Sequence, residues 1–399
     1  MRLPIYLDHN ATTPLDPAVF DVMKPYFLTK FGNPSSVEHH YGHEAGQAVE
    51  AAREEVAKAV GARPEEIVFT GSCTEANNLA IQGVARSFPD RDHFVTSRVE
   101  HPSVLEPFRW LENQGKRVTY LQVDESGLVE PKDVAAALTP RTALVSIMAA
   151  NNEVGTLQDV SEIGRICEEA EILFHSDLAQ AAAYVPIDVQ SQHLHLASLS
   201  AHKAYGPKGV GALYVRSRRP RARLAPIVFG GGQERGLRSG TISPPLTVGM
   251  GAALSKAQEV RDKEVPVVMA MRDRMFDALS SRLGGLRLNG HATRRLPNTL
   301  SISIEGVEPH ALIRQLREAV SFSASSACAS QKVETSHVLL AIHGDSWRAR
   351  NAIRLAPGRF TKGEEIDFAI DAICEGARRL RSAVGGAVAG RVTQGLSSG

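Results

Sequence analysis

The chain has 399 residues, of which 43% are hydrophobic and 22% charged, as in an ordinary globular enzyme large enough for two domains. Its net charge of +1 provides no overall field that would recruit nucleic acid or an anionic membrane surface. No apolar run approaches the ~20 residues of a membrane span, and the N-terminal apolar run is too short for a signal peptide, so we expect a cytoplasmic protein. Cys73, Cys167, Cys328 and Cys374 are far apart and predict neither a disulfide framework nor a zinc site.

The first half of the chain alternates between two hydrophobic patterns. Residues 6–14 predict a short extended segment ending in a turn, and residues 43–60 carry apolar side chains at helical spacing. From residue 67 onward, short apolar and partly β-branched runs alternate with helical patterns such as 160–170. The predicted strands are residues 67–70, 94–97, 118–123, 142–148, 172–176 and 211–215. This alternation predicts an α/β fold with a mostly parallel sheet covered by helices on both faces.

The second half begins with a long helical pattern at residues 245–283, where Pro266 predicts a kink or an interruption. The pattern after it is that of a smaller α+β domain. Its predicted elements are strands at 298–304 and 352–355 and helices that begin near residues 309, 336 and 362. Residues 384–399 are rich in Gly, Ala and Ser and predict a flexible tail.

Polar residues follow five of the apolar runs, at the point where each strand is expected to end. In a doubly wound sheet, ligands bind beyond the carboxyl ends of the strands. The residues at these ends are 70–74, 100–101, 151–153, 177–180 and 200–203. Each group alone is compatible with ordinary capping or turn chemistry, but together they form a coherent cofactor site.

The residue types at these ends match the needs of pyridoxal phosphate. Residues 71–74 precede a helix and offer backbone N–H groups and a hydroxyl to a phosphate. Asp177 could hold a cationic ring nitrogen, and His101 could stack on a flat cofactor or move protons. Lys203 could form a Schiff base, because a desolvated lysine amine loses its proton readily. Each feature also has a structural interpretation. Residues 71–74 could simply cap a helix, and Asp177 could cap a strand end. His101 could be a structural or surface histidine, and Lys203 an exposed lysine.

Five stretches in chain order resemble the cysteine desulfurases, specifically the branch that serves nitrogen fixation and iron–sulfur cluster assembly. They are AANNEVG at 149–155, HSDLAQ at 175–180, SLSAHKAYGPKG at 198–209, GGGQERGLRSGT at 230–241 and SSAC at 325–328. The likeness runs from Tyr6 to about Leu380. It implies a fold-type I pyridoxal-phosphate enzyme that works as a homodimer with shared active sites.

The resemblance also implies roles for residues around the cofactor. Lys203 would form the Schiff base and later move protons, Asp177 would pair with the pyridine nitrogen, and Gln180 would hydrogen-bond the ring hydroxyl. His101 would stack on the ring. The phosphate would be held by Cys73, Thr74, Ser200 and His202, and by Thr241 from the partner subunit.

On the substrate side, the resemblance implies that Asn152 and Arg354 orient L-cysteine, with the Arg354 guanidinium gripping the α-carboxylate in a bidentate fork. Cys328 would be the nucleophile that takes the sulfur, becomes a persulfide and releases L-alanine. Residues 322–335 are mostly small and polar, so we expect a mobile loop that carries the persulfide outward. Cys167 and Cys374 lie within predicted helices and are expected to be core residues.

The same resemblance suggests domain borders. We expect a large cofactor-binding domain at residues 15–257, and a small domain at 1–14 and 258–383 that carries the nucleophile loop. Two departures from the family pattern stand out: Ser325 replaces a glycine that is usual near the nucleophile, and the tail after Leu380 does not resemble the one that docks the cluster scaffold.

The sulfur acceptor therefore stays open among an iron–sulfur scaffold, a tRNA-thiolation relay and a DNA sulfur-modification pathway. The basic run 216–223 lacks interleaved aromatic residues, so we interpret it as a solvated face and do not expect direct nucleic-acid binding. The alternative functions are a pyridoxal-phosphate aminotransferase, a selenocysteine or cystine lyase, and a partner-binding relative without catalysis. Neither alternative enzyme would need Cys328, whereas a desulfurase requires it.

Overall fold

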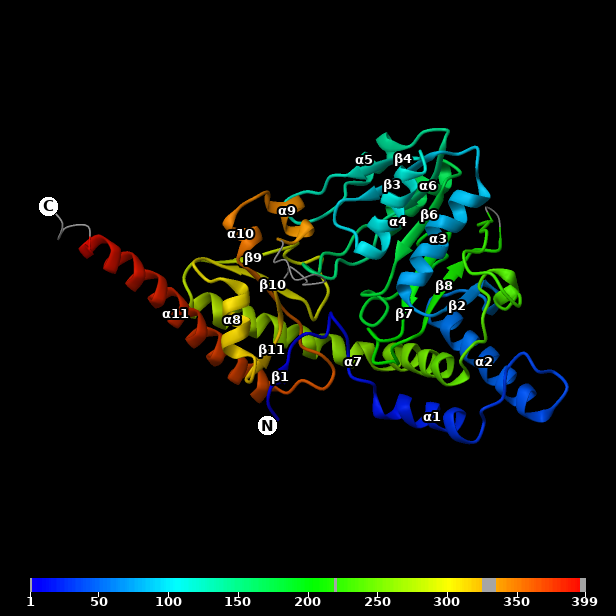
Figure 1. Cartoon of the computed structure of the whole chain (residues 1–399), viewed down its shortest axis with the longest axis horizontal. Coiled ribbons are helices and arrows are strands. Elements are labelled where there is room, and N and C mark those ends of the chain that lie inside the picture. The colour runs from blue at the N-terminus through cyan, green and yellow to red at the C-terminus, as the bar shows by residue number, and fades with distance from the viewer. Residues whose placement is uncertain (1, 219–220, 325–334, 395–399) are drawn as a thin grey trace. The chain divides into compact units, whose positions relative to one another are not determined.

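The computed structural model describes residues 2–218, 221–324 and 335–394, and side chains as far as residue 383 (Figure 1). The chain divides into two compact units. The larger comprises Ala11–Asn152 and Thr156–Lys263, and the smaller comprises Met1–Asn10, Glu153–Gly155 and Glu264–Gly399. None of the described helices is long and apolar enough to cross a lipid bilayer.

The larger unit is built on a seven-stranded sheet with the order β2-β8-β7-β6-β5-β3-β4. Its strands are β2 (Ile67–Thr70), β3 (His93–Ser97), β4 (Arg117–Leu121), β5 (Thr142–Ser146), β6 (Leu173–Asp177), β7 (Leu196–Ser200) and β8 (Gly211–Val215). The pairs from β4 through β7 are parallel, whereas β8 runs antiparallel to both β7 and β2. Most of these strands are buried along their whole length, as expected for a sheet covered on both faces. The predicted α/β fold with a mostly parallel sheet is confirmed.

Helices connect and cover these strands (Figure 1). They are α1 (Pro17–Leu28), α2 (His40–Ala59), α3 (Cys73–Ser87), α4 (Pro102–Asn113), α5 (Pro131–Ala137) and α6 (Val160–Glu169). The inner faces of α3 and α4 pack on β5 and β3 through fully buried side chains such as Leu79, Val104 and Phe108. Since α3 begins directly after β2 and α4 soon after β3, both helix N-termini lie near the carboxyl ends of their strands.

The smaller unit contains a four-stranded antiparallel sheet of the order β12-β13-β10-β9 and a parallel pair, β1 (Ile5–Tyr6) with β11 (Val320–Ser321). The four strands are β9 (Leu286–Leu288), β10 (Leu300–Ile304), β12 (Ser323–Ala324) and β13 (Ala352–Leu355). Its helices include α8 (Pro309–Leu316), α9 (His337–His343), α10 (Trp347–Arg350) and α11 (Gly363–Gln394). The core packs β10 and β13 against α8 and α11 through residues such as Ile302, Leu355 and Ile370.

Two long helices bear on the sequence-based expectations. The helix α7 (Pro244–Arg282) begins in the larger unit and ends in the smaller, and Pro266 lies inside it without interrupting it. The helix α11 continues to Gln394, beyond residue 384, where the sequence predicts a flexible tail.

Candidate active site

The N-terminus of α3 forms the candidate phosphate seat. Ser72 caps the helix, its hydroxyl accepting a hydrogen bond from the Glu75 N–H at 3.1 Å, and Cys73 and Thr74 occupy the first two helical positions. The neighbouring strand β8 approaches this turn closely at Gly211, where a Cβ atom would stand 2.5 Å from the Ser72 carbonyl carbon. The site therefore combines a capped helix N-terminus with a backbone approach that only glycine permits.

Asp177 ends β6 with its carboxylate held by three donors. Its Oδ1 accepts from the Ala179 N–H at 2.9 Å and from the Cys73 Sγ at 3.6 Å, while Oδ2 accepts from the Asn77 side-chain amide at 2.8 Å. Burial and the Asp177 charge raise the pKa of Cys73 well above its ordinary value, and the Lys203 charge offsets part of that rise. Cys73 is therefore a neutral thiol that lies within electrostatic range of both Asp177 and Lys203.

Lys203 follows β7 in a turn that several hydrogen bonds fix. Its amine donates to the Ala11 carbonyl at 2.7 Å. On either side of it, Thr13 bonds the His202 carbonyl at 2.9 Å and the Tyr205 N–H at 2.9 Å. Tyr205 is 1% exposed and has a positive φ of 62°, an arrangement uncommon for a bulky residue. The hydrogen bonds of this turn thus hold the lysine in place, and Tyr205 keeps its uncommon backbone conformation within it.

His202 and Ser200 flank the lysine turn. Burial, followed by the charges of Lys203 and Lys208, lowers the pKa of His202 to about 4, so its ring is neutral at physiological pH. Its Nδ1 lies 3.1 Å from the Thr12 hydroxyl. Ser200 ends β7 and is 1% exposed. Both residues lie at the same sheet edge as Asp177, because β6 and β7 are parallel neighbours.

His101 caps α4 at the carboxyl end of β3. Its Nδ1 accepts from the Ser103 N–H at 3.1 Å and lies 2.8 Å from the Ser103 hydroxyl. The preceding residue, Glu100, is completely buried and accepts hydrogen bonds from the Ser97 hydroxyl at 2.7 Å and the Met148 N–H at 3.0 Å. Burial raises the pKa of Glu100 to about 8.

The remaining predicted residues of the larger unit are more dispersed. Gln180 follows β6 and is 8% exposed, and Asn152 follows β5 and is half-buried. Thr241 is exposed and stands three residues before α7. A cavity of about 630 Å³ adjoins the site and is lined by Thr74, His101 and Trp110, among others.

Arg354 lies in the smaller unit, in the middle of β13. Its Nη2 donates to the Asp8 Oδ1 at 2.8 Å, and the Ser323 hydroxyl donates to the other Asp8 oxygen at 2.8 Å. Arg354 is 7% exposed, so the carboxylate of Asp8 and the hydroxyl of Ser323 hold a nearly buried guanidinium in place. Cys328, the predicted nucleophile, lies outside the described residues.

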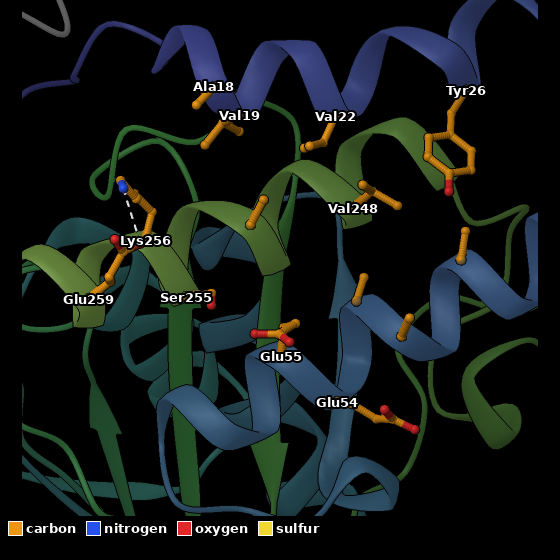
Figure 2. Close-up of a pocket in the computed structure, with 14 residues that line it drawn as sticks. Ala18, Val19, Val22, Tyr26, Glu54, Glu55, Val248, Ser255, Lys256 and Glu259 are labelled. Atoms are coloured by element: carbon orange, nitrogen blue, oxygen red, sulfur yellow. Dashed lines mark hydrogen bonds and ion pairs between the residues drawn. The ribbon is translucent and has the colours of Figure 1, made fainter.

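An apolar groove lies apart from this chemistry, between α1, α2 and the start of α7. Figure 2 shows Val19 and Val22 of α1 facing Val248 of α7 across it. At one end of the groove, Lys256 forms an ion pair with Glu259 at 3.0 Å. None of the predicted site residues lines the groove, so its apolar surface is not a second candidate for the cofactor site.

Sequence reasoning missed several residues that organise the site. Asn77 is fully buried and holds Asp177, Asp8 holds Arg354, and Thr13 anchors the lysine turn. The available signal for Asn77 was a polar residue one helical turn after Cys73, on the face of α3 that packs against the sheet. Asp8 and Arg354 are 346 residues apart, and no local pattern connects them.

The residues present fit pyridoxal phosphate. The capped N-terminus of α3, which β8 approaches closely at Gly211, suits a phosphate. The buried carboxylate of Asp177, held by neutral donors, suits a ring nitrogen, and the fixed amine of Lys203 suits an aldehyde. Fold and site together define the α/β class of pyridoxal-phosphate-dependent transferases.

Comparisons with known proteins narrow this class. The sequence model of the aminotransferase class-V family matches residues 5–368. Cysteine desulfurase IscS of Rickettsia bellii is 46% identical over 380 residues, covering 95% of this chain and 92% of the relative. IscS of Rickettsia felis is 45% identical with the same coverage.

Solved structures agree with the sequence comparison. A NifS-like protein is 36% identical with a TM-score of 0.87, covering 94% of this chain and 99% of its own. DndA from Streptomyces lividans is 35% identical with a TM-score of 0.75, covering 88% of this chain and 100% of its own. The chain therefore belongs to the aminotransferase class-V family and, within it, to the IscS- and NifS-like cysteine desulfurases.

Proposed function

We propose that this protein removes sulfur from L-cysteine, releases L-alanine and carries the sulfur as a persulfide on Cys328 to an acceptor. The observation that carries the proposal is the convergence of Lys203, Asp177 and the N-terminus of α3 at one sheet edge, in a chain 46% identical to a cysteine desulfurase. A solved relative that is 37% identical, SspA, is described in complex with cysteine, which supports the choice of substrate.

The cofactor would be held by residues of the larger unit. The N-terminus of α3 with Cys73 and Thr74, together with Ser200 and His202, would receive the phosphate. Asp177 would pair with the ring nitrogen, Gln180 would bond the ring hydroxyl, and His101 would cover one ring face. When bound, pyridoxal phosphate supplies the electron sink that weakens the bond between the substrate's β-carbon and its sulfur.

Three residues would orient and deprotonate the substrate. The guanidinium of Arg354 would take the α-carboxylate, and its bond to Asp8 fixes the orientation of the fork before substrate arrives. Asn152 would contact the substrate from the end of β5. The Lys203 amine would remove the proton from the α-carbon and later return a proton to the three-carbon product, a role suited to an amine held in one turn.

Cys328 would perform the transfer itself. Its thiolate would attack the substrate sulfur, forming the sulfur–sulfur bond of the persulfide while the carbon–sulfur bond breaks and its electron pair stays with the carbon. Protonation at that carbon yields alanine. Two other cysteines are poorer nucleophiles, because the pKa of Cys73 is raised well above its ordinary value and burial raises the pKa of Cys167 to about 12.

We further propose that the enzyme is a homodimer in which Thr241 reaches the phosphate of the partner subunit. Large apolar side chains are exposed at and after α1 and close to Thr241 along the chain, including Phe31 at 66%, Val37 at 85% and Phe229 at 76%. Exposed large apolar side chains in such number favour an interface between copies. Sedimentation of the purified chain tests this, and a monomer that retains full activity would contradict it.

The acceptor stays open among the three kinds that the sequence suggests. One group of relatives is named IscS, and another solved relative is DndA, so the comparisons do not choose between pathways. Incubation with labelled L-cysteine and each class of acceptor would decide, and the class that removes label from Cys328 fastest identifies the pathway.

The test of the activity is direct. Incubation with L-cysteine should yield alanine in equal amount to the sulfur transferred, and a lysine-linked cofactor should be trapped on Lys203 by borohydride. Alanine formation that required an added keto acid would instead indicate an aminotransferase. Preference for selenocysteine or cystine, with full activity in Cys328→Ser, would indicate a lyase.

A further inference from the structure

A chain of hydrogen bonds runs between His101 and Asp177 through two residues for which the proposed mechanism has no role. Asn77 on α3 is completely buried, and its side-chain nitrogen donates both to the Asp177 Oδ2 at 2.8 Å and to the Ser103 hydroxyl at 2.8 Å. Ser103 on α4 is 8% exposed and lies 2.8 Å from the His101 Nδ1. The two ends of this chain are the residues expected to contact the ring nitrogen and the ring face of the cofactor.

The direction of each bond follows from the chemistry of the groups. A carboxylate only accepts, so the Asn77 amide must turn its NH₂ group toward Asp177, and its second hydrogen then reaches the Ser103 oxygen. Ser103 has its own hydrogen left to donate to the His101 Nδ1. That nitrogen also accepts the Ser103 backbone N–H at 3.1 Å, so it has no room for a proton of its own.

This arrangement fixes the state of the imidazole. With two donors directed at Nδ1, the neutral ring of His101 carries its proton on Nε2. Protonation or tautomer exchange at Nδ1 would break both bonds. The arrangement also has a cost, because the Asn77 side-chain oxygen is buried without a hydrogen-bond partner among the residues that the structure describes. A buried amide usually satisfies its oxygen, so the orientation of this amide is set by the two acceptors that its NH₂ group contacts.

We propose that Asn77 and Ser103 are positioning residues that join His101 to Asp177 and hold the proton of His101 on Nε2. A change at His101 therefore alters the hydrogen bonding of Asp177, and a change at Asp177 alters that of His101. The proposal rests on the proposed function in one respect: it takes His101 and Asp177 as the residues that face the cofactor. It adds that His101 and Asp177 do not act independently, because the Asn77 amide bonds Asp177 directly and His101 through Ser103.

The test uses three single variants, one double variant that combines Ser103→Ala with Asn77→Leu, and a matched control. Ser103→Ala removes the hydroxyl from the chain, and Ser103→Thr keeps it. Asn77→Leu removes the amide at similar volume. The control is Ser303→Ala, which deletes another buried serine hydroxyl, 2.7 Å from the Arg348 carbonyl in the smaller unit, without touching the site.

Two readouts are independent of turnover. Nitrogen NMR of histidine-labelled enzyme, with the His101 signals assigned from their loss in His101→Gln, gives the tautomer ratio. Absorbance titration of the cofactor-free enzyme with pyridoxal phosphate gives its dissociation constant. Ser103→Ala should lower the ratio of the Nε2–H to the Nδ1–H form about fivefold, the usual net effect of one hydrogen bond, while Ser103→Thr and Ser303→Ala keep the wild-type ratio.

The double variant tests the coupling. Ser103→Ala should weaken cofactor binding less on the Asn77→Leu background than in the wild type, because the shared amide is already gone. The proposal is overturned if wild-type His101 carries its proton on Nδ1, if Ser103→Ala leaves the tautomer ratio unchanged, or if the two substitutions weaken binding independently. Failure of the wild type to produce alanine from cysteine would instead refute the proposed function and leave the NMR result standing.

Discussion

Burial of Glu100 makes the folding of this enzyme sensitive to pH, and Glu100→Gln should remove the contribution of this residue. The carboxyl group is completely buried directly before His101, where its oxygens accept from the Ser97 hydroxyl and the Met148 N–H. Burial raises its pKa to about 8, whereas its ordinary value is 4.5. The folded protein therefore keeps a proton on Glu100 at neutral pH that the unfolded chain releases.

The sign of the effect follows from this difference. Between pH 4.5 and 8 Glu100 binds a proton more tightly in the folded state than in the unfolded state, so the contribution of Glu100 to the free energy of unfolding decreases as the pH rises through this range. Each pH unit is worth about 1.4 kcal/mol, so the loss across the range has an upper bound of about 5 kcal/mol. The single side-chain oxygen of a glutamine can still accept from the Ser97 hydroxyl and the Met148 N–H, as the Oε1 of Glu100 does, but a glutamine cannot ionise. Relative to the wild type, Glu100→Gln should therefore be stabilised at pH 8 and not at pH 5.

Urea unfolding of the cofactor-free protein at a fixed concentration, from pH 5 to pH 8.5, measures this difference. Glu125→Gln, at an exposed carboxylate after β4, is the matched control and should follow the wild-type curve. Parallel pH curves for the wild type and Glu100→Gln would show that Glu100 is already ionised in the folded protein, and the reasoning from its burial would then be wrong.

Three other substitutions have expected outcomes that differ in kind. Arg354→Lys should raise KM for L-cysteine at least tenfold with a smaller change in kcat, because an ammonium cannot form the bidentate fork; equal KM values would contradict this. Glu234→Gln should lower the free energy of unfolding by ~3–5 kcal/mol in urea, because it leaves the Arg53 charge buried without the carboxylate that now bonds it at 2.7 and 2.8 Å. Cys73→Ser saturated with pyridoxal phosphate should keep the persulfide yield within about twofold by thiol-specific mass spectrometry, since the raised pKa of Cys73 makes it a poor nucleophile; transferred sulfur found on Cys73 of the wild type would contradict this.

The sequence predicted the larger unit well because buried parallel strands have a plain signature. Their apolar runs, each followed by polar residues, located the carboxyl ends of β2, β3, β5 and β6 and with them Asp177, whereas Lys203 was located through the motif around it. The hydrophobic pattern of a strand does not depend on the direction in which the strand runs, so it did not reveal that β8 is antiparallel to its neighbours. The hydrophobic pattern is also weak where serine alternates with apolar residues, as it does in β7 (Leu196–Ser200). That strand was predicted mainly from the motif that follows it.

The parts of the site that sequence could not predict depend on contacts between distant segments. Asp8 meets Arg354 because β1, near the N-terminus, pairs with β11 in the smaller unit, and Glu153–Gly155 return to that unit from the middle of the chain. Glu153 illustrates the consequence: burial raises its pKa to about 7, although its sequence neighbours Asn152 and Val154 give no sign of it. Likewise, Asn77 and Ser103 meet only because α3 and α4 pack together on one face of the sheet.

The decisive question is whether Cys328 receives sulfur from L-cysteine with the help of a cofactor bound at Lys203. The most direct measurement is the mass of the Cys328 peptide after one turnover with sulfur-labelled L-cysteine, together with the alanine released. We expect one labelled sulfur on Cys328 per alanine in the wild type, and neither product in Lys203→Ala. Label on a different cysteine, or undiminished sulfur transfer in Cys328→Ser, would contradict the proposed function.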